Sequence, residues 1–125
     1  MMSRDLTILT DVSLITCIVQ RGKADKVVQT AQEAGASGAT IYYGYGSGVR
    51  ERLGVLGLAI DVEKEIITAM VADDQADRIF ERMYFAAELD VPGNGVIYMT
   101  RLEKAATFIP KDILDRVHAK GSHRP

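Results

Sequence analysis

The sequence has few cysteines and histidines and no long hydrophobic run. Cys17 is the single cysteine, so no internal disulfide can form, which fits a reducing compartment. No apolar stretch approaches the roughly 20 residues that a membrane-spanning helix needs. No signal-peptide pattern, an apolar core followed by a cleavage site, is present near the N-terminus. These absences predict a cytoplasmic protein that does not insert into a membrane.

An excess of either charge is lacking as well. The chain has 15 Lys and Arg against 17 Asp and Glu, a formal net charge of −2. Nucleic-acid binders usually carry a basic stripe, so no nucleic-acid partner is expected. There is no Ser-His-Asp set, Walker loop or GxGxxG pattern, and His118 and His123 have no Cys or carboxylate set at ligand spacing. We therefore expect neither an enzyme nor a metal protein.

The composition is typical of a soluble globular protein. Of the 125 residues, 47% are hydrophobic and 26% are charged. A chain of this length has room for one domain, with a core large enough to fold unaided. We expect a single domain over residues 1–125, with its core within about 11–109, a loop at 44–62 and a C-terminal tail at about 119–125.

The stretch Glu65–Thr100 predicts a strand, a helix and a second strand. The apolar run Ile66–Val71 precedes Asp73 and Asp74, whose charge suits a helix start and either of which is expected to cap it. Apolar residues then recur at helical spacing, at Ala76, Ile79, Phe80, Met83 and Ala87. A Pro-Gly turn ends the helix before the apolar run Val96–Met99.

The first half of the chain predicts the same order of elements. Asp11–Gln20 is dense in β-branched residues and predicts a strand, and Lys23–Ala34 predicts a helix that ends at a left-handed Gly35. Ala39–Tyr45 predicts a second strand and Glu63–Ala72 a third. The remaining expectations are a loose arm at 1–10, an edge strand at Ala105–Ile109 and a short helix at Lys111–His118.

The order βαββαβ predicts an α+β fold, a ferredoxin-like sandwich whose four-stranded antiparallel sheet carries both helices on one face. The other face is then bare, yet the first and third strands are apolar on both sides. In the first strand, Leu14 and Ile18 lie on one side, and Ile15 and Cys17 lie on the other, where Cys17 is expected to pack in the core. A bare apolar face is unusual for a monomer, so we expect oligomerisation through it.

Two glycine-rich segments are candidate binding elements. Gly44–Gly57 holds five glycines and predicts a long mobile loop with apolar residues that a mere spacer would not need. We expect this loop to bind a protein partner. Its candidate contact residues are Arg50, Glu51, Arg52 and Leu53. The segment Pro92–Gly95 is typical of a tight turn, but successive backbone N–H groups in such a turn can also cradle phosphate oxygens.

Four segments match the motifs of one family of signalling proteins, in order and in spacing. They are the opening strand Leu14–Val19, the Gly44-Tyr45-Gly46 that is similar to the start of a long T-loop, the strand and VADDQ-type helix start of Ile66–Phe80, and the Gly93-Asn94-Gly95 that is similar to a Gly-Asp-Gly B-loop. Together they cover most of Leu14–Met99. The sequence thus resembles the PII superfamily of nitrogen regulatory proteins, as a divergent member.

The resemblance implies a homotrimer with nucleotide clefts between neighbouring subunits. It also implies a non-enzymatic regulator whose T-loop docks on a target, commonly a membrane transporter or an enzyme. The implied effector is a small molecule, with an adenine nucleotide as the leading candidate, and no permanent cofactor is implied. The candidate effector-binding residues are Gly44, Tyr45, Gly46, Gly93, Asn94, Gly95, Arg101 and Lys104.

Three positions depart from the family pattern. Val96 stands where the B-loop carries a basic residue, and Thr107 and Ile109 stand near two family arginines. Without these cations a triphosphate loses charge-assisted hydrogen bonds worth about 1.5–3 kcal/mol each. We therefore expect weak triphosphate binding and a preference for a less charged adenine ligand. The cations that would compensate are Arg50, Arg101 and Lys104.

Two other classes of function stay open. One is a metal-responsive or small-metabolite-binding ferredoxin-like trimer, and the other is a small enzyme whose site is shared between subunits. Metal-loaded mass spectrometry would separate a metal-responsive trimer from a nucleotide sensor. The leading hypothesis is a cytoplasmic PII-like trimer in which a small anionic effector shifts the population of a partner-binding loop.

Overall fold

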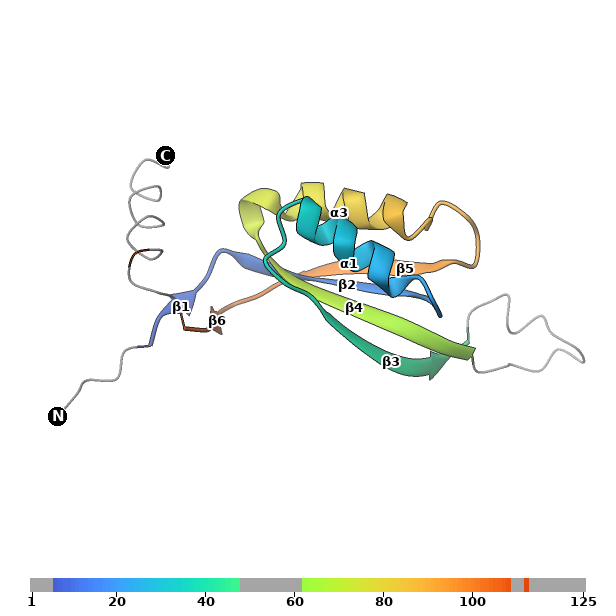
Figure 1. Cartoon of the computed structure of the whole chain (residues 1–125). Helices are drawn as coiled ribbons and strands as arrows, with labels where there is room; N and C mark the ends of the chain where they lie inside the picture. The colour runs from blue at the N-terminus through green and yellow to red at the C-terminus, as the bar shows by residue number, and fades with distance from the viewer. Residues whose placement is uncertain (1–5, 48–61, 109–111, 113–125) are drawn as a thin grey trace, which may run out of the picture.

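The computed structural model describes residues 6–47, 62–108 and 112 (Figure 1). The elements in chain order are β1 (Ile8–Leu9), β2 (Val12–Gln20), α1 (Ala24–Glu33), β3 (Thr40–Gly46), β4 (Val62–Ala72), α3 (Asp73–Ala86), β5 (Gly95–Arg101) and β6 (Ala105–Ala106). The expected terminal helix at 111–118 (apart from Asp112), the tail and most of the loop at 44–62 lie outside the described residues.

The main sheet has the order β3-β4-β2-β5, and every neighbouring pair is antiparallel. Strand β2 is central: Val12 to Gln20 pairs with Ala72 to Lys64 of β4, and Ser13 to Val19 pairs with Arg101 to Gly95 of β5. Both helices lie on one face of this sheet (Figure 1). The predicted ferredoxin-like α+β fold is confirmed.

The core fills the space between the sheet and the two helices. Alternate residues of β2 and β4 enter it, among them Ile15 and Ile67, both fully buried. Cys17 also packs there as predicted, and burial raises the pKa of its thiol to about 12, so the thiol stays protonated at neutral pH. Helices α1 and α3 contribute Val27, Ala31, Ile79 and Met83 to this cluster. The periodic apolar faces predicted for both helices are therefore the buried ones.

The opposite face of the sheet has no helix over it among the described residues (Figure 1). One cross-strand row on this face joins Tyr42, Ile66, Ile18 and Val96. Tyr42 is 48% exposed and Val96 is 50% exposed, and Tyr98 in the next row is 48% exposed. The side chains of this face thus form the bare apolar surface that the two-sided strands predict.

Three expectations about the ends of elements were wrong. The N-terminal arm is not wholly loose, because Ile8–Leu9 pairs with Ala105–Ala106 in a separate two-stranded sheet. The strand expected at Ala105–Ile109 is therefore not an edge of the main sheet. Neither aspartate caps α3, since the N-cap residue is Ala72 and no side chain makes a capping hydrogen bond. The Asp73 carboxylate is instead drawn to Ser13, whose hydroxyl donates to it at 2.7 Å.

The N-terminus of α1 is capped from a distant strand. The Glu65 side chain on β4 is 9% exposed, and its Oε1 accepts hydrogen bonds from the backbone N–H groups of Gly22 at 2.7 Å and Ala24 at 3.0 Å. No local side chain caps this helix. A carboxylate at a helix N-terminus satisfies donors that would otherwise lack partners and is also favoured by the helix dipole. Glu65 therefore fixes the connection between β2 and α1.

Gly95 at the start of β5 is required by its backbone and its surroundings. Its φ is +147°, and a Cβ at this position would collide with the carbonyl oxygen of Ile18 on the neighbouring strand. Only a residue without a side chain permits this close approach. The turn before β5 is therefore packed directly against the backbone of the central strand.

We expect Glu65→Ala to lower the free energy of unfolding by about 2 kcal/mol, because two buried N–H groups lose their acceptor. Glu63→Ala is the matched control, since Glu63 forms an ion pair at 3.7 Å with Arg21, whose side chain is 77% exposed, and it should change stability by less than about 0.5 kcal/mol. Urea denaturation measures both variants. Equal effects of the two would contradict the capping role.

We expect Gly95→Ala to destabilise the protein by about 2 kcal/mol or more, because the new methyl group meets the Ile18 carbonyl at a strained φ. Gly38→Ala is the control, since a Cβ there meets nothing within 4 Å and its φ needs no glycine. Thermal unfolding of both variants makes the comparison. A Gly95 variant as stable as the Gly38 variant would show that the approach of β5 to β2 is looser than described.

Candidate functional site

The two glycine segments lie at the same end of the sheet. Gly95 pairs with Val19 near the end of β2, and Gly46 pairs with Val62 at the start of β4. They belong to opposite edges, however, because β3 and β5 are the outer strands. Three strand spacings separate them, about 14 Å at the usual spacing. The two predicted halves of the site thus share one end of one subunit without touching across it.

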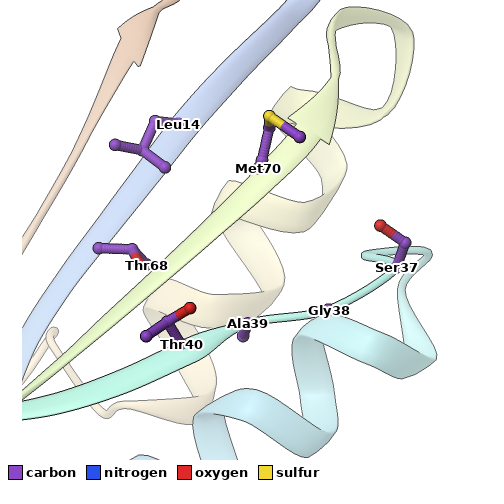
Figure 2. Close-up of a pocket in the computed structure, with 7 residues that line it drawn as sticks. All are labelled: Leu14, Ser37, Gly38, Ala39, Thr40, Thr68 and Met70. Carbon is purple, nitrogen blue, oxygen red and sulfur yellow. The ribbon is translucent and has the colours of Figure 1, made fainter. Parts of the chain in front are cut away.

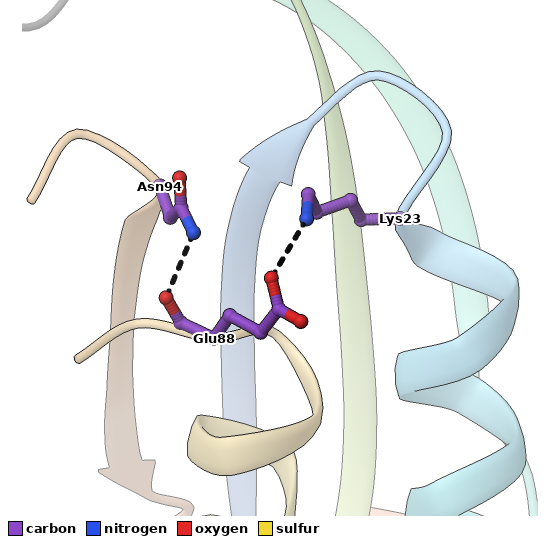
Figure 3. Close-up of polar contacts among 3 residues, drawn as sticks. All are labelled: Lys23, Glu88 and Asn94. Carbon is purple, nitrogen blue, oxygen red and sulfur yellow. Dashed lines mark hydrogen bonds and ion pairs between the residues drawn. The ribbon is translucent and has the colours of Figure 1, made fainter. Parts of the chain in front are cut away.

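The turn at Gly93-Asn94-Gly95 is held by hydrogen bonds from three directions. The backbone N–H of Asn94 donates to the carbonyl of Val91 at 3.2 Å, and Gly93 has a φ of +86°. The Asn94 side-chain amide donates to the carbonyl of Glu88 at 2.9 Å (Figure 3). The Gln20 amide, at the end of β2, donates to the carbonyl of Gly93 at 3.0 Å. The turn is therefore both a tight turn and a fixed one, placed by its neighbours.

Glu88 links this turn to the start of α1. It follows the C-cap of α3 with a φ of +54°, and it is the one described non-glycine residue with positive φ. Its carboxylate forms an ion pair with the ammonium of Lys23 at 3.2 Å (Figure 3). Sequence reasoning missed Gln20, Lys23 and Glu88, because each acts on a residue distant in the chain. A left-handed position after a helix usually holds glycine or asparagine, so nothing in the sequence marked Glu88.

The residues predicted at the base of the loop are part of β3. Gly44 and Gly46 lie within the strand, paired with Lys64 and Val62, so the strand extends one residue beyond its predicted end at Tyr45. Tyr45 between them is 78% exposed and is available to a ligand or a partner. The candidate partner-binding residues Arg50, Glu51, Arg52 and Leu53 lie outside the described residues.

Arg101 and Lys104 are not gathered with the glycine turns within one chain. Arg101 pairs with Ser13 at the far end of β5, six residues from Gly95, which is about 20 Å along a strand. Its Nη2 lies 3.2 Å from Oδ2 of Asp73, while the arginine side chain is 76% exposed. Lys104 is exposed and follows on the same side, before β6. The predicted set of binding residues therefore falls into two groups at opposite ends of the sheet.

A hollow of about 370 Å³ lies on the bare face, toward the Arg101 end (Figure 2). Its lining is Leu14, Ser37, Gly38, Ala39, Thr40, Thr68 and Met70. Leu14 and Met70, which are cross-strand partners, supply apolar walls from the two central strands, and Thr40 and Thr68 form the next cross-strand pair beside them (Figure 2). Apolar walls with a few polar groups suit a small organic ligand. Sequence reasoning did not foresee this hollow, since it depends on the register of three strands.

Other site types find no support among the residues described. No group of three or more His, Cys, Asp or Glu stands together in a way that would hold a metal ion in residues 6–47 and 62–108. In the same part of the chain, no helix is long and apolar enough to cross a membrane. The chemistry that the described residues offer is therefore the backbone of the Gly93-Asn94-Gly95 turn, exposed tyrosines, and a small hollow lined by both hydroxyl and apolar groups.

Comparison with known proteins agrees with the fold. The chain is similar to the solved structure of Arabidopsis thaliana PII bound to citrate, with a TM-score of 0.60 and 18% sequence identity over 75% of this chain and 79% of that one. No curated protein sequence matches it. The family model described as nitrogen regulatory protein P-II matches residues 12–111, which spans the whole main sheet and both helices. The chain therefore belongs to the P-II family and is a PII-like regulatory signalling protein.

Proposed function

We propose that this regulator works as a homotrimer that senses a small anionic effector, with an adenine nucleotide as the first candidate, and controls a protein partner through the loop at 44–62. The partner is a membrane transporter or an enzyme. The bare sheet face is the observation that carries the proposal. It leaves Tyr42, Val96 and Tyr98 about half exposed on a face that no described helix covers, and an exposed apolar face of this kind is typical of a contact surface.

An effector cleft between subunits accounts for the distribution of the binding elements. Within one chain the Gly93-Asn94-Gly95 turn and the glycines at the end of β3 lie at one end of the sheet, and the hollow at Thr40 and Met70 lies toward the other. A single small ligand does not reach both. If neighbouring copies meet through their bare faces, the hollow of one copy can lie beside a glycine turn of the next. The base would then pack against apolar strand residues while backbone N–H groups of the turn receive the anionic end.

The loop at 44–62 is the proposed partner-binding element, through which effector binding acts on the partner. It connects β3 to β4, and its first residues, Gly44 to Gly46, lie at the same end of the sheet as the Gly93-Asn94-Gly95 turn. Because β3 and β5 are opposite edges of one sheet, a ligand at the turn of one copy would reach the start of the loop in a neighbouring copy. If it binds one conformation of the loop better than another, it shifts the population by that difference in affinity. This gives effector binding a route to partner binding without catalysis.

We expect light scattering to report a trimer at micromolar concentration and Ile66→Lys to dissociate or aggregate it. Ile66 lies on the bare face between Ile18 and Tyr42, and a lysine there would bury an unpaired charge in the contact. Phe85→Lys is the control, because Phe85 is 57% exposed on α3, on the helix side. It should leave the trimer intact. A well-folded wild-type monomer, or equal behaviour of the two variants, would remove the basis for a shared cleft.

We expect AMP or a cyclic nucleotide to bind at least as tightly as ATP in calorimetry. Val96 and Thr107 are neutral and exposed, so a triphosphate lacks charge-assisted hydrogen bonds there and loses about tenfold or more in affinity for each. The comparison is with a triple variant that neutralises Arg50, Arg101 and Lys104, whose ATP affinity is measured in the same way. If the triple variant still binds ATP with micromolar or tighter affinity, the charge argument is refuted. If calorimetry detects no binding of any adenine ligand, the adenine effector is refuted.

A further inference from the structure

The ion pair between Lys23 and Glu88 stands next to the turn where the anion of an effector is proposed to bind. The Lys23 ammonium lies 3.2 Å from Oε2 of Glu88, and the Glu88 carbonyl accepts from the Asn94 amide at 2.9 Å (Figure 3). The ammonium is therefore linked to the turn through a single residue, Glu88. Charges this close are only partly screened by salt, because the Debye length is about 10 Å at 0.1 M salt. At this range both charges of the pair act on an anion in the turn.

The pair is built so that it can open at little cost. The side chains are 37% exposed at Lys23 and 50% exposed at Glu88, and an ion pair in contact with water contributes little to stability. Lysine carries its charge on a flexible four-carbon stem, so the ammonium can turn to another acceptor. Opening the pair leaves the turn in place, because Asn94 is bound to the backbone carbonyl of Glu88 and Gln20 to that of Gly93.

The backbone of Glu88 gives independent reason to ask what its side chain does. Its φ of +54° places it in the left-handed region directly after α3, where glycine is favoured and a side chain is strained. A glutamate here also places a negative charge at the helix C-terminus, which the helix dipole disfavours. Packing does not account for it, since the side chain is half exposed. Its one described side-chain partner is Lys23.

We infer that Lys23 is a transferable cation that pairs with Glu88 in the free protein and moves to the anionic group of the effector when that group enters the turn. This inference rests on the proposed effector site at Gly93-Asn94-Gly95. Glu88 then acts as a competitor for the ammonium and, through its own charge, weakens anion binding. The two members of one ion pair should therefore have opposite effects on affinity, which a purely structural pair would not show.

The test measures binding of three probes by calorimetry and by the backbone amide NMR signals of Gly93, Asn94 and Gly95. The probes are tripolyphosphate, ATP and adenosine. The variants are Lys23→Met, Glu88→Gln and Glu88→Gly, the last of which also relieves the left-handed strain and so guards against a folding defect. Glu63→Gln is the matched control, because it removes a carboxylate from another exposed ion pair, that with Arg21 at 3.7 Å.

We expect Lys23→Met to weaken tripolyphosphate and ATP by about tenfold, the loss of one charge-assisted hydrogen bond. Both Glu88 variants should tighten these two probes severalfold. Adenosine should bind all variants alike, and Glu63→Gln should leave all three affinities near those of the wild type. In the Lys23→Met background, Glu88→Gln should still tighten anion binding, but by less, because only the repulsion remains to be removed.

Three results would overturn the inference. They are equal anion affinities in all variants, weaker binding in both Lys23 and Glu88 variants, and no anion binding to any of them. The proposed function is tested separately by adenosine and by the advantage of ATP over tripolyphosphate. If the variants change tripolyphosphate affinity as expected but ATP binds no more tightly than tripolyphosphate and adenosine does not bind, the role of Lys23 is supported and the adenine effector is refuted. If ATP binds all variants with equal affinity, the adenine effector is supported and the role of Lys23 is refuted.

Discussion

The carboxylate of Glu65 holds the part of the chain on which the candidate site depends. By accepting from the N–H groups of Gly22 and Ala24, it fixes the turn between β2 and α1. That turn is flanked by Gln20, which binds Gly93, and by Lys23, which binds Glu88. A single buried acceptor on β4 therefore sets the positions of two side chains that hold the glycine turn before β5. Removing this acceptor should therefore loosen the Gly93-Asn94-Gly95 turn as well as lower the overall stability.

The second constraint is that two helices cover one face of a sheet whose central strands, β2 and β4, are apolar on both sides. The helices cover one face, where Ile15, Ile67 and Val27 are fully buried. The rows through Ile66 and Thr68 on the other face leave Tyr42, Val96 and Tyr98 about half exposed to solvent. Burying this face against other copies of the chain would gain roughly 25 cal/mol per Å² of apolar surface. Assembly and effector binding are thus linked in the proposed function, because the hollow lies on the same face.

Periodicity was enough to predict the sheet, both helices and the two sides of β2, since burial follows the spacing of apolar residues. Gly35 and the Pro92–Gly95 turn were also predictable, because glycine and proline restrict or free the backbone locally. Contacts between distant segments were not. Asp73 was expected to cap α3 but bonds to Ser13, and Arg101 was grouped with Gly95 although the strand between them spans about 20 Å. Lys23 and Glu88 are 65 residues apart, and no local pattern joins them.

The proposed assembly and effector cleft are tested together by a structure of the assembled protein, determined by crystallography or electron cryo-microscopy in the presence of an adenine nucleotide. We expect copies that meet through the face carrying Ile66 and Tyr98, with the hollow at Thr40 and Met70 of one copy beside the Gly93-Asn94-Gly95 turn of its neighbour. The nucleotide should lie between them. Copies that leave this face exposed to solvent, or a nucleotide bound within one chain away from both elements, would contradict the proposal.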